Sequence, residues 1–284
     1  MRILVVGCSG MLGTELVAAF GTGHEVEGID LPRIDITDPG RCLAAAEDLK
    51  PEVIVNAAAF TRVDDCETMR DKALQVNGYG AGNLSAAAAA SGALLVHYSS
   101  DYVFDGLKGE PYVEEDPPNP QSVYGQSKLL GEVMVRKHCP NHLIIRTSWL
   151  FGTNGPNFVR TIVGLARKGS MLRVVDDQRG SPTYAKDLAI QTVKMVEAGC
   201  RSTYHVTNSG SCTWFELASK AVEWSGMPNA PITPVSTQEF PRPAPRPSNS
   251  VLSNCRLAQQ GLSIMRPWQS AVREYVEKEF HGTA

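Results

Sequence analysis

The sequence predicts an α/β fold in which a doubly wound parallel sheet carries a smaller C-terminal α/β lobe. Short apolar runs rich in β-branched residues alternate with helical patterns through the first half of the chain, which is the order that a parallel sheet requires. The first run leads directly into a glycine-rich turn and a helix. We expect residues 1–148 to form the sheet domain and residues 149–284 to form mainly the lobe, with residues 183–207 returning to the sheet.

Composition excludes several classes of function. The 284 residues are 43% hydrophobic, which is enough for a large core. The net charge is −3 and the pI about 6.1, so no basic surface is expected for nucleic acid or an anionic membrane. No apolar run reaches the length of a membrane span, and the chain starts with a strand rather than a secretory signal. We therefore expect a cytoplasmic protein.

The seven cysteines give no sign of a metal site or a disulfide framework. They are scattered, odd in number and without a CxxC pair. Reduced thiols in a cytosol fit this pattern best. We expect no protein-held metal, and the sequence leaves any dependence on Mg²⁺ open.

A glycine-rich turn follows the first predicted strand. Gly7, Gly10 and Gly13 precede a helical pattern over residues 14–20. At this spacing Gly7 and Gly10 let the backbone approach a pyrophosphate, the helix N-terminus adds partial positive charge, and Gly13 allows close helix packing. Asp30 ends the second predicted strand, where an acid can accept hydrogen bonds from an adenosine ribose. Residues 1–148 are therefore expected to be a dinucleotide-binding domain.

Two further segments belong to the expected coenzyme crevice. Residues 53–56 read as a buried strand, and the three alanines that follow would let the backbone lie against the coenzyme. Asp35 could approach the adenine or be a solvated loop acid. Asp38 followed by Pro39 predicts the start of a helix over residues 39–49. The residues expected to bind the coenzyme are Gly7, Ser9, Gly10, Met11, Leu12, Gly13, Asp30, Asp35, Ile36, Ala57, Ala58, Ala59, Asn77, Tyr124 and Lys128.

The middle of the chain carries a candidate catalytic set. Ser100 follows an apolar strand at residues 94–98, and Tyr124 and Lys128 lie four apart at the start of a predicted helix, on one face. An ammonium near a phenol favours phenolate, so Tyr124 could exchange protons near neutral pH. A packed Tyr and a solvated Lys would show the same spacing by chance. The glycine-rich coenzyme motif at residues 7–13 favours the catalytic interpretation over the chance one.

The rest of the chain reads as alternating helices and strands with a proline-rich interruption. Residues 73–91 predict one alanine-rich helix, and six prolines between residues 231 and 247 predict irregular backbone. His97 reads as a core histidine. A polar loop is expected at 176–184, strands are expected at 143–147, 172–175 and 203–207, and helices at 157–168, 185–198, 214–225 and 267–280.

These motifs resemble the extended short-chain dehydrogenase/reductase family. The glycine spacing matches its coenzyme turn, and Ser100 with Tyr124 and Lys128 matches its catalytic set. Within that family the chain resembles the dTDP-4-dehydrorhamnose reductases, through residues 55–64, 98–106, 123–132, 146–149, 177–183, 246–252 and 267–268. The chain departs from the pattern at Ser253 and Asn254, where an acid is common. This departure puts in doubt the metal-dependent dimer contact of some relatives, and a homodimer stays open.

The resemblance implies reduction of the C4 keto group of dTDP-4-dehydro-L-rhamnose to dTDP-L-rhamnose. NADPH or NADH would supply hydride, Tyr124 the proton and Ser100 the orientation of the carbonyl, while Lys128 lowers the pKa of Tyr124. Asp30 favours NADH by repelling a 2′-phosphate, and the nearby Arg33 softens that preference, so we expect both coenzymes to be used. The residues expected to contact the dTDP-sugar are Thr61, Val63, Asp64, Ser100, Asp101, Tyr102, Trp149, Gln178, Ser181, Pro182, Thr183 and Arg246.

Several of these assignments have alternatives. Trp149 could be a core residue at the seam between domains, and Asp64 a first-turn helix acid. Arg246 and Arg179 could pair with the diphosphate or be solvated. The chain could also be a related nucleotide-sugar reductase, epimerase or dehydratase. A non-catalytic, coenzyme-binding regulatory subunit of the methionine adenosyltransferase type is a further alternative, against which the intact catalytic set argues.

Overall fold

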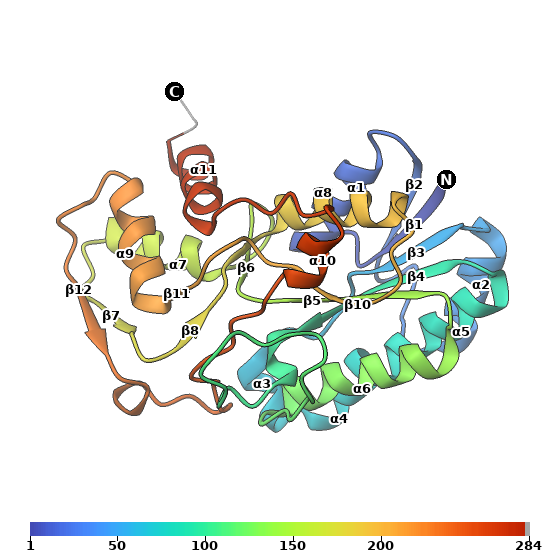
Figure 1. Ribbon diagram of the computed structural model, residues 1–284, viewed down its shortest axis with the longest axis horizontal. Helices are drawn as coiled ribbons and strands as arrows, with labels where there is room; N and C mark the ends of the chain where they lie inside the picture. The colour runs from blue at the N-terminus through green and yellow to red at the C-terminus, as the bar shows by residue number, and fades with distance from the viewer. Residues whose placement is uncertain (282–284) are drawn as a thin grey trace.

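The computed structural model describes residues 1–281 and is built around a six-stranded parallel sheet (Figure 1). The inner strands β1, β3, β4 and β5 are short, mostly buried runs, as parallel strands covered on both faces require, whereas the edge strand β2 buries only Ile29. The strand order is β10-β5-β4-β3-β1-β2, which confirms the predicted doubly wound α/β fold. The strands are β1 (Arg2–Val6), β2 (Glu25–Ile29), β3 (Val53–Asn56), β4 (Leu94–Ser100), β5 (His142–Thr147) and β10 (Ser202–His205).

Helices cover both faces of the sheet (Figure 1). On one face α1 (Met11–Phe20) and α8 (Ala185–Glu197) pack together over a core that includes Leu16 and Leu188. The other face is covered by α2 (Pro39–Leu49), α5 (Ala81–Ser91) and α6 (Val123–His138), with Leu84 and Val135 in its core.

Local signals define the start of α2 as predicted. The Asp38 carboxylate accepts hydrogen bonds from the backbone N–H groups of Gly40 and Arg41, and Pro39 occupies the first turn. Residues 73–91 are helical as predicted, but they do not form one regular α-helix. The segment divides into α4 (Arg70–Ala73), the π-helical turn η1 (Leu74–Gly80) and α5, preceded by the short α3 (Val63–Thr68). The wider η1 turn packs tightly, because a Cβ on Gly78 would lie 2.4 Å from Leu130 of α6.

The C-terminal lobe has its own core. It contains α7 (Phe158–Arg167), α9 (Trp214–Trp224) and α11 (Trp268–Phe280), which enclose buried side chains such as Tyr275 and Phe151. In the proline-rich stretch, expected to be irregular, β12 (Ile232–Val235) pairs in parallel with β7 (Leu172–Val175). The polar segment 176–184 contains two short strands, β8 (Arg179–Gly180) and β9 (Thr183–Tyr184), whose partners are β11 (Cys212–Thr213) and β6 (Leu150–Phe151). The remaining short elements are η2 (Asp101–Val103), η3 (Thr237–Glu239) and α10 (Cys255–Gln259).

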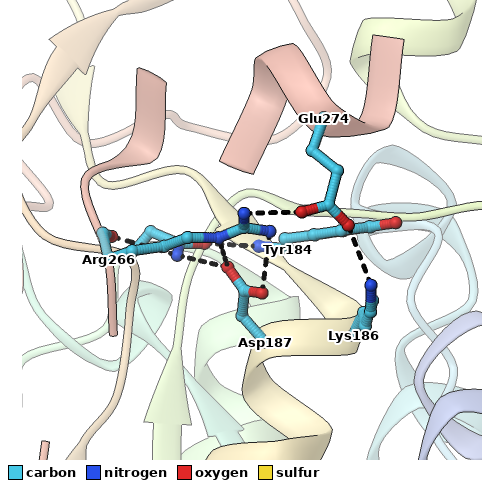
Figure 2. A network of polar contacts seen from close by, with 6 residues as sticks. Tyr184, Lys186, Asp187, Arg266 and Glu274 are labelled. Atoms are coloured by element: carbon cyan, nitrogen blue, oxygen red, sulfur yellow. Dashed lines mark hydrogen bonds and ion pairs between the residues drawn. The ribbon is translucent and has the colours of Figure 1, made fainter. Parts of the chain in front are cut away.

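Two links connect the C-terminal part of the chain to the sheet. The segment 202–205 pairs with β5 as the outermost strand, β10. Figure 2 shows the second link, in which the Arg266 guanidinium contacts Asp187 of α8 at 2.9 Å and Glu274 of α11 at 2.6 Å. Lys186 donates to the same Glu274 carboxylate. These ion pairs fasten the last helix of the lobe to a helix that covers the sheet.

The cysteines, the possible metal ligands and the helix lengths can be compared with the expectations from the sequence. All seven cysteines are unpaired. Across residues 1–281 the structure shows no group of three or more metal-ligating His, Cys, Asp or Glu side chains, and no helix long and apolar enough to cross a membrane. At the position where the family often has an acid, Asn254 bonds both backbone groups of Thr207 and thereby anchors α10 to the end of β10.

Candidate active site

The glycine turn after β1 is shaped by close backbone contacts. Gly7 has φ +82°, and a Cβ there would lie 2.6 Å from the amide nitrogen of Ala58. A Cβ on Gly13 would lie 2.0 Å from the carbonyl oxygen of Gly7. Gly10 is different, because a Cβ there would meet only the Gly7 oxygen, at 3.4 Å. Gly7 and Gly13 therefore serve packing within the turn, whereas Gly10 faces open space.

The N-terminus of α1 is suited to an anion. Gly10 occupies the cap position without a side-chain cap, and no acid lies in the first turn. The first backbone N–H groups of the helix are thus left for a ligand, with the helix dipole favouring negative charge. Asp30 borders this region, where its carboxylate accepts hydrogen bonds from the N–H groups of Ser9 at 3.1 Å and Leu31 at 2.9 Å. Arg33, by contrast, is paired with Glu27.

Three other predicted coenzyme residues have structural roles of their own. Asp35 Oδ1 accepts hydrogen bonds from both the N–H and the hydroxyl of Thr37, which lower the pKa of Asp35. Ile36 is buried in the core between sheet and helices. Asn77, on η1, donates to the Phe60 carbonyl and the Ser127 hydroxyl and accepts from the Phe60 N–H. Its amide thereby ties the loop after Ala57–Ala59 to α6.

Ser100 and Tyr124 meet at the carboxyl end of β4. The Ser100 hydroxyl donates to Asp101 Oδ1 at 2.8 Å, and its oxygen accepts the Tyr102 N–H. Tyr124 lies on the first turn of α6, whose start is capped by Ser122. Burial and the charge of Asp101 raise the pKa of Tyr124, while a hydrogen bond with Ser100 lowers it. The predicted lowering of this pKa by Lys128 is therefore wrong.

The position of Lys128 explains that difference. Its Nζ atom is buried and donates to the Tyr98 carbonyl oxygen at 2.6 Å. Burial lowers the pKa of Lys128 to about 8, although the charge of Glu132 opposes the change. His97 is buried beside Asn56, and burial together with Lys128 lowers its pKa well below the usual value. A neutral core histidine is the result, as predicted.

A buried carboxyl and a buried ion pair complete the surroundings of the catalytic set. Burial raises the pKa of Asp101 to about 6, with hydrogen bonds from Ser250 and Ser100 opposing the shift. Between α6 and β5, Glu132 accepts two hydrogen bonds from Arg146 at 2.8 Å each. Neither the role of Ser250 nor the ion pair was predicted from the sequence, because the partners are distant along the chain.

The predicted substrate residues fall into two groups. Asp64 in the first turn of α3, Tyr102 on η2 and Arg246 in the proline-rich segment lie together beside Tyr124. Val63 is the first residue of α3, and Thr61 lies in the loop that leads into that helix.

The second group lies in the lobe. Ser181, Pro182 and Thr183 are buried around β9, and the Ser181 carbonyl accepts from Ser148. Gln178 donates to Thr237. Trp149 stacks on Trp214 with ring centroids 3.6 Å apart, and a Cβ on Gly180 would lie 2.3 Å from its ring. Trp149 is therefore half-buried against the core of the lobe, and its contact with the sugar stays a prediction.

Comparisons with known proteins match one family over nearly the whole chain. The family model described as the RmlD substrate binding domain matches residues 1–280. The spore coat polysaccharide biosynthesis protein SpsK of Bacillus subtilis is 42% identical, over 98% of this chain and 97% of its own.

Two solved structures are similar in both sequence and fold. The dTDP-4-dehydrorhamnose reductase of Clostridium acetobutylicum is 41% identical with a TM-score of 0.95, and the match covers 98% of this chain and 99% of that one. The reductase of the same name from Bacillus anthracis, solved in complex with NADP, is 37% identical with a TM-score of 0.94, covering 96% and 98%.

Proposed function

The chain belongs to the family of dTDP-4-dehydrorhamnose reductases, and from this premise we propose that it reduces the C4 keto group of dTDP-4-dehydro-L-rhamnose to give dTDP-L-rhamnose. The single observation that supports the residue assignments is the contact of Ser100 with Tyr124 at the carboxyl end of β4, with the Lys128 ammonium buried nearby on the Tyr98 carbonyl. This arrangement supports proton delivery to a carbonyl held beside a nicotinamide coenzyme.

The coenzyme is held by the open surface around Gly10. The uncapped N-terminus of α1 receives the pyrophosphate, Asp30 receives the adenosine ribose, and Ala57–Ala59 line the crevice. When bound, NADPH or NADH supplies the hydride to the sugar C4 carbon. Asp35, Ile36 and Asn77 act indirectly, by shaping the loops that border the crevice.

Tyr124 donates its phenol proton to the C4 oxygen as the carbonyl becomes an alcohol. The phenol is protonated at neutral pH and can therefore give a proton, while the raised pKa makes it a weaker acid than an ordinary tyrosine. A hydrogen bond with Ser100 lowers the pKa of Tyr124 and so stabilises the phenolate that remains, whereas Lys128 is held at the Tyr98 carbonyl. Such positioned proton transfer contributes roughly 10²–10⁴-fold to the rate.

Ser100 has one hydroxyl proton, and Asp101 accepts it. In this state the Ser100 oxygen can accept the Tyr124 proton but cannot donate to the substrate. Orientation of the carbonyl by Ser100 therefore requires the hydroxyl to turn away from Asp101 when the substrate enters. Thr61, Val63, Asp101 and Tyr102 would border the sugar, and Gln178 with residues 181–183 would approach from the lobe.

Both coenzymes are proposed to be used, with NADH favoured by Asp30. The Asp30 carboxylate is held near the turn by the Ser9 and Leu31 N–H groups, where it would repel a 2′-phosphate. Arg33 lies nearby, although its guanidinium is engaged by Glu27.

The test is NAD(P)H consumption by the purified protein with freshly generated dTDP-4-dehydro-L-rhamnose, followed by identification of the product. Formation of dTDP-L-rhamnose supports the proposal. Coenzyme binding without turnover would instead favour another 4-keto sugar, or the regulatory-subunit alternative if the protein also copurified with a synthetase. An epimerase would show no net consumption.

A further inference from the structure

Asp64 is the point at which the proline-rich segment is attached beside the active site. Its Oδ1 atom lies 3.0 Å from Nη2 of Arg246 and accepts the Ala244 N–H at 3.2 Å. Arg242 approaches Oδ2 at 3.9 Å. One carboxylate of the sheet domain therefore holds three positions of a segment that arrives from the lobe.

The Arg246 guanidinium connects this attachment to the catalytic tyrosine. It lies over the Tyr102 ring, 6.0 Å from the centroid, and Tyr102 meets the Tyr124 ring edge to face at 5.5 Å. A cavity of about 200 Å³, lined by residues including Tyr102, Ser122 and Arg246, opens beside the contact. The Tyr102 ring is therefore held between the guanidinium and Tyr124, with room to move into the cavity if the guanidinium is released.

The far side of the segment is fixed independently. Ser248 and Asn249 donate hydrogen bonds to the carbonyl oxygens of Gly106 and Lys108, and a Cβ on Gly106 would lie 2.4 Å from Pro247. The Ser248 carbonyl in turn accepts the Arg179 N–H. Because this end is already anchored, loss of Asp64 should free residues 242–246 without unfolding the protein.

The ion pair is less exposed to solvent than an ordinary surface pair. The side chains of Arg246 and Asp64 are 17% and 29% exposed, whereas the neighbouring Arg62–Asp65 pair is 66% and 43% exposed. Screening by water and salt is correspondingly weaker for the first pair. Asp65, one residue along the same helix, thus provides a matched control.

We propose that Asp64 is a positioning residue, which acts through Arg246 to hold the Tyr102 ring against Tyr124 rather than by touching the sugar. The inference rests on the proposed reductase function and deepens it. It also gives Asp64 a different role from the direct substrate contact expected from the sequence. The geometry of proton delivery then depends on a contact between the two parts of the chain.

The kinetic test is a double-mutant cycle with Asp64→Asn and Arg246→Met. Asp64→Asn alone should lower kcat by about 10- to 100-fold, since a misplacement of about 1 Å at a reacting group can cost roughly 10²-fold. It should leave the dissociation constant of the coenzyme unchanged, and Asp65→Asn should behave as wild type. In the Arg246→Met background, Asp64→Asn should have no further effect.

Three results would overturn the proposal. The first is that Asp64→Asn lowers kcat as much in the Arg246→Met background as in wild type. The second is that Asp64→Asn changes KM alone. The third is that Asp64→Asn has the wild-type kcat. Hydrogen exchange tests the attachment without substrate: peptides that contain Ala244 should lose protection in Asp64→Ala, which removes the acceptor of the Ala244 N–H, but not in Asp65→Ala. Unchanged protection would refute the attachment. A wild-type enzyme inactive on every dTDP-4-keto sugar would instead refute the proposed function, and the exchange result would still decide whether Asp64 holds the segment.

Discussion

The ammonium of Lys128 donates a hydrogen bond to the Tyr98 carbonyl oxygen at 2.6 Å, inside the protein at the end of β4. This contact fixes the ammonium one helical turn beyond Tyr124 and leaves the phenol under the influence of burial and Asp101. Tyr124 is therefore a neutral phenol at physiological pH. That state is the one from which a reduction begins.

Tyr124→Phe should retain coenzyme binding and lose nearly all turnover. The substitution removes only the phenol oxygen, and proton transfer of this kind contributes roughly 10²–10⁴-fold to the rate. Coenzyme fluorescence titration and single-turnover rates measure the two properties separately. A variant with wild-type rates would show that another group supplies the proton.

Gly10→Ala should weaken coenzyme binding without destabilising the fold. A Cβ at residue 10 meets only one protein atom, at 3.4 Å, but projects into the surface proposed for the pyrophosphate. We expect the dissociation constant of NADH to rise at least about tenfold, which corresponds to about 1.4 kcal/mol. Gly23→Ala is the control, since nothing lies within 4 Å of a Cβ there. Equal affinities for the two variants would place the pyrophosphate elsewhere.

Asp30→Ser should shift the coenzyme preference towards NADPH. Removing the carboxylate relieves repulsion of a 2′-phosphate, so the ratio of kcat/KM for NADPH to that for NADH should rise by about tenfold or more. Asp48→Asn, an exposed acid on α2, should leave the ratio unchanged. The idea fails if Asp30→Ser and Asp48→Asn give the same ratio.

Glu132→Gln should destabilise the protein at neutral pH. Burial opposes ionisation of Glu132, but Arg146, with Ser99 and Arg136, outweighs burial and lowers its pKa to about 2 from 4.5. A depressed carboxyl pKa stabilises the fold above about pH 4.5, and that contribution is lost as the pH falls towards 2. Breaking a buried pair of this kind costs about 3–5 kcal/mol.

The measurement is the free energy of unfolding of wild type and Glu132→Gln by urea denaturation across this pH range. The difference between the two proteins should be largest above pH 4.5 and should shrink as the pH falls. A difference that is constant with pH would mean that the ionised form of Glu132 is not what stabilises the fold.

Local sequence signals predicted the fold and much of the site because they act over short distances. Asp38 with Pro39 marks the start of α2, and the turn of Gly7 to Gly13 marks the junction of β1 and α1. Tyr124 and Lys128 share a helix, so their proximity follows from their spacing. The roles of these residues in catalysis remain predictions.

Features that depend on distant partners were not predicted. The π-helical turn at Leu74–Gly80 has no local signature and reflects packing of Gly78 against Leu130. The stack of Trp149 on Trp214 joins residues from different elements of the lobe. The pKa of Tyr124 depends on where Lys128 points, which spacing along a helix does not determine.

The most direct test of the central claim is the fate of deuterium from C4-deuterated NADH or NADPH. We predict that the enzyme transfers the label to C4 of the sugar, giving dTDP-L-rhamnose that carries deuterium at that carbon alone. Tyr124→Phe should form little labelled product while still binding the coenzyme. Label that stays on the coenzyme, or that appears at another carbon, would contradict the account.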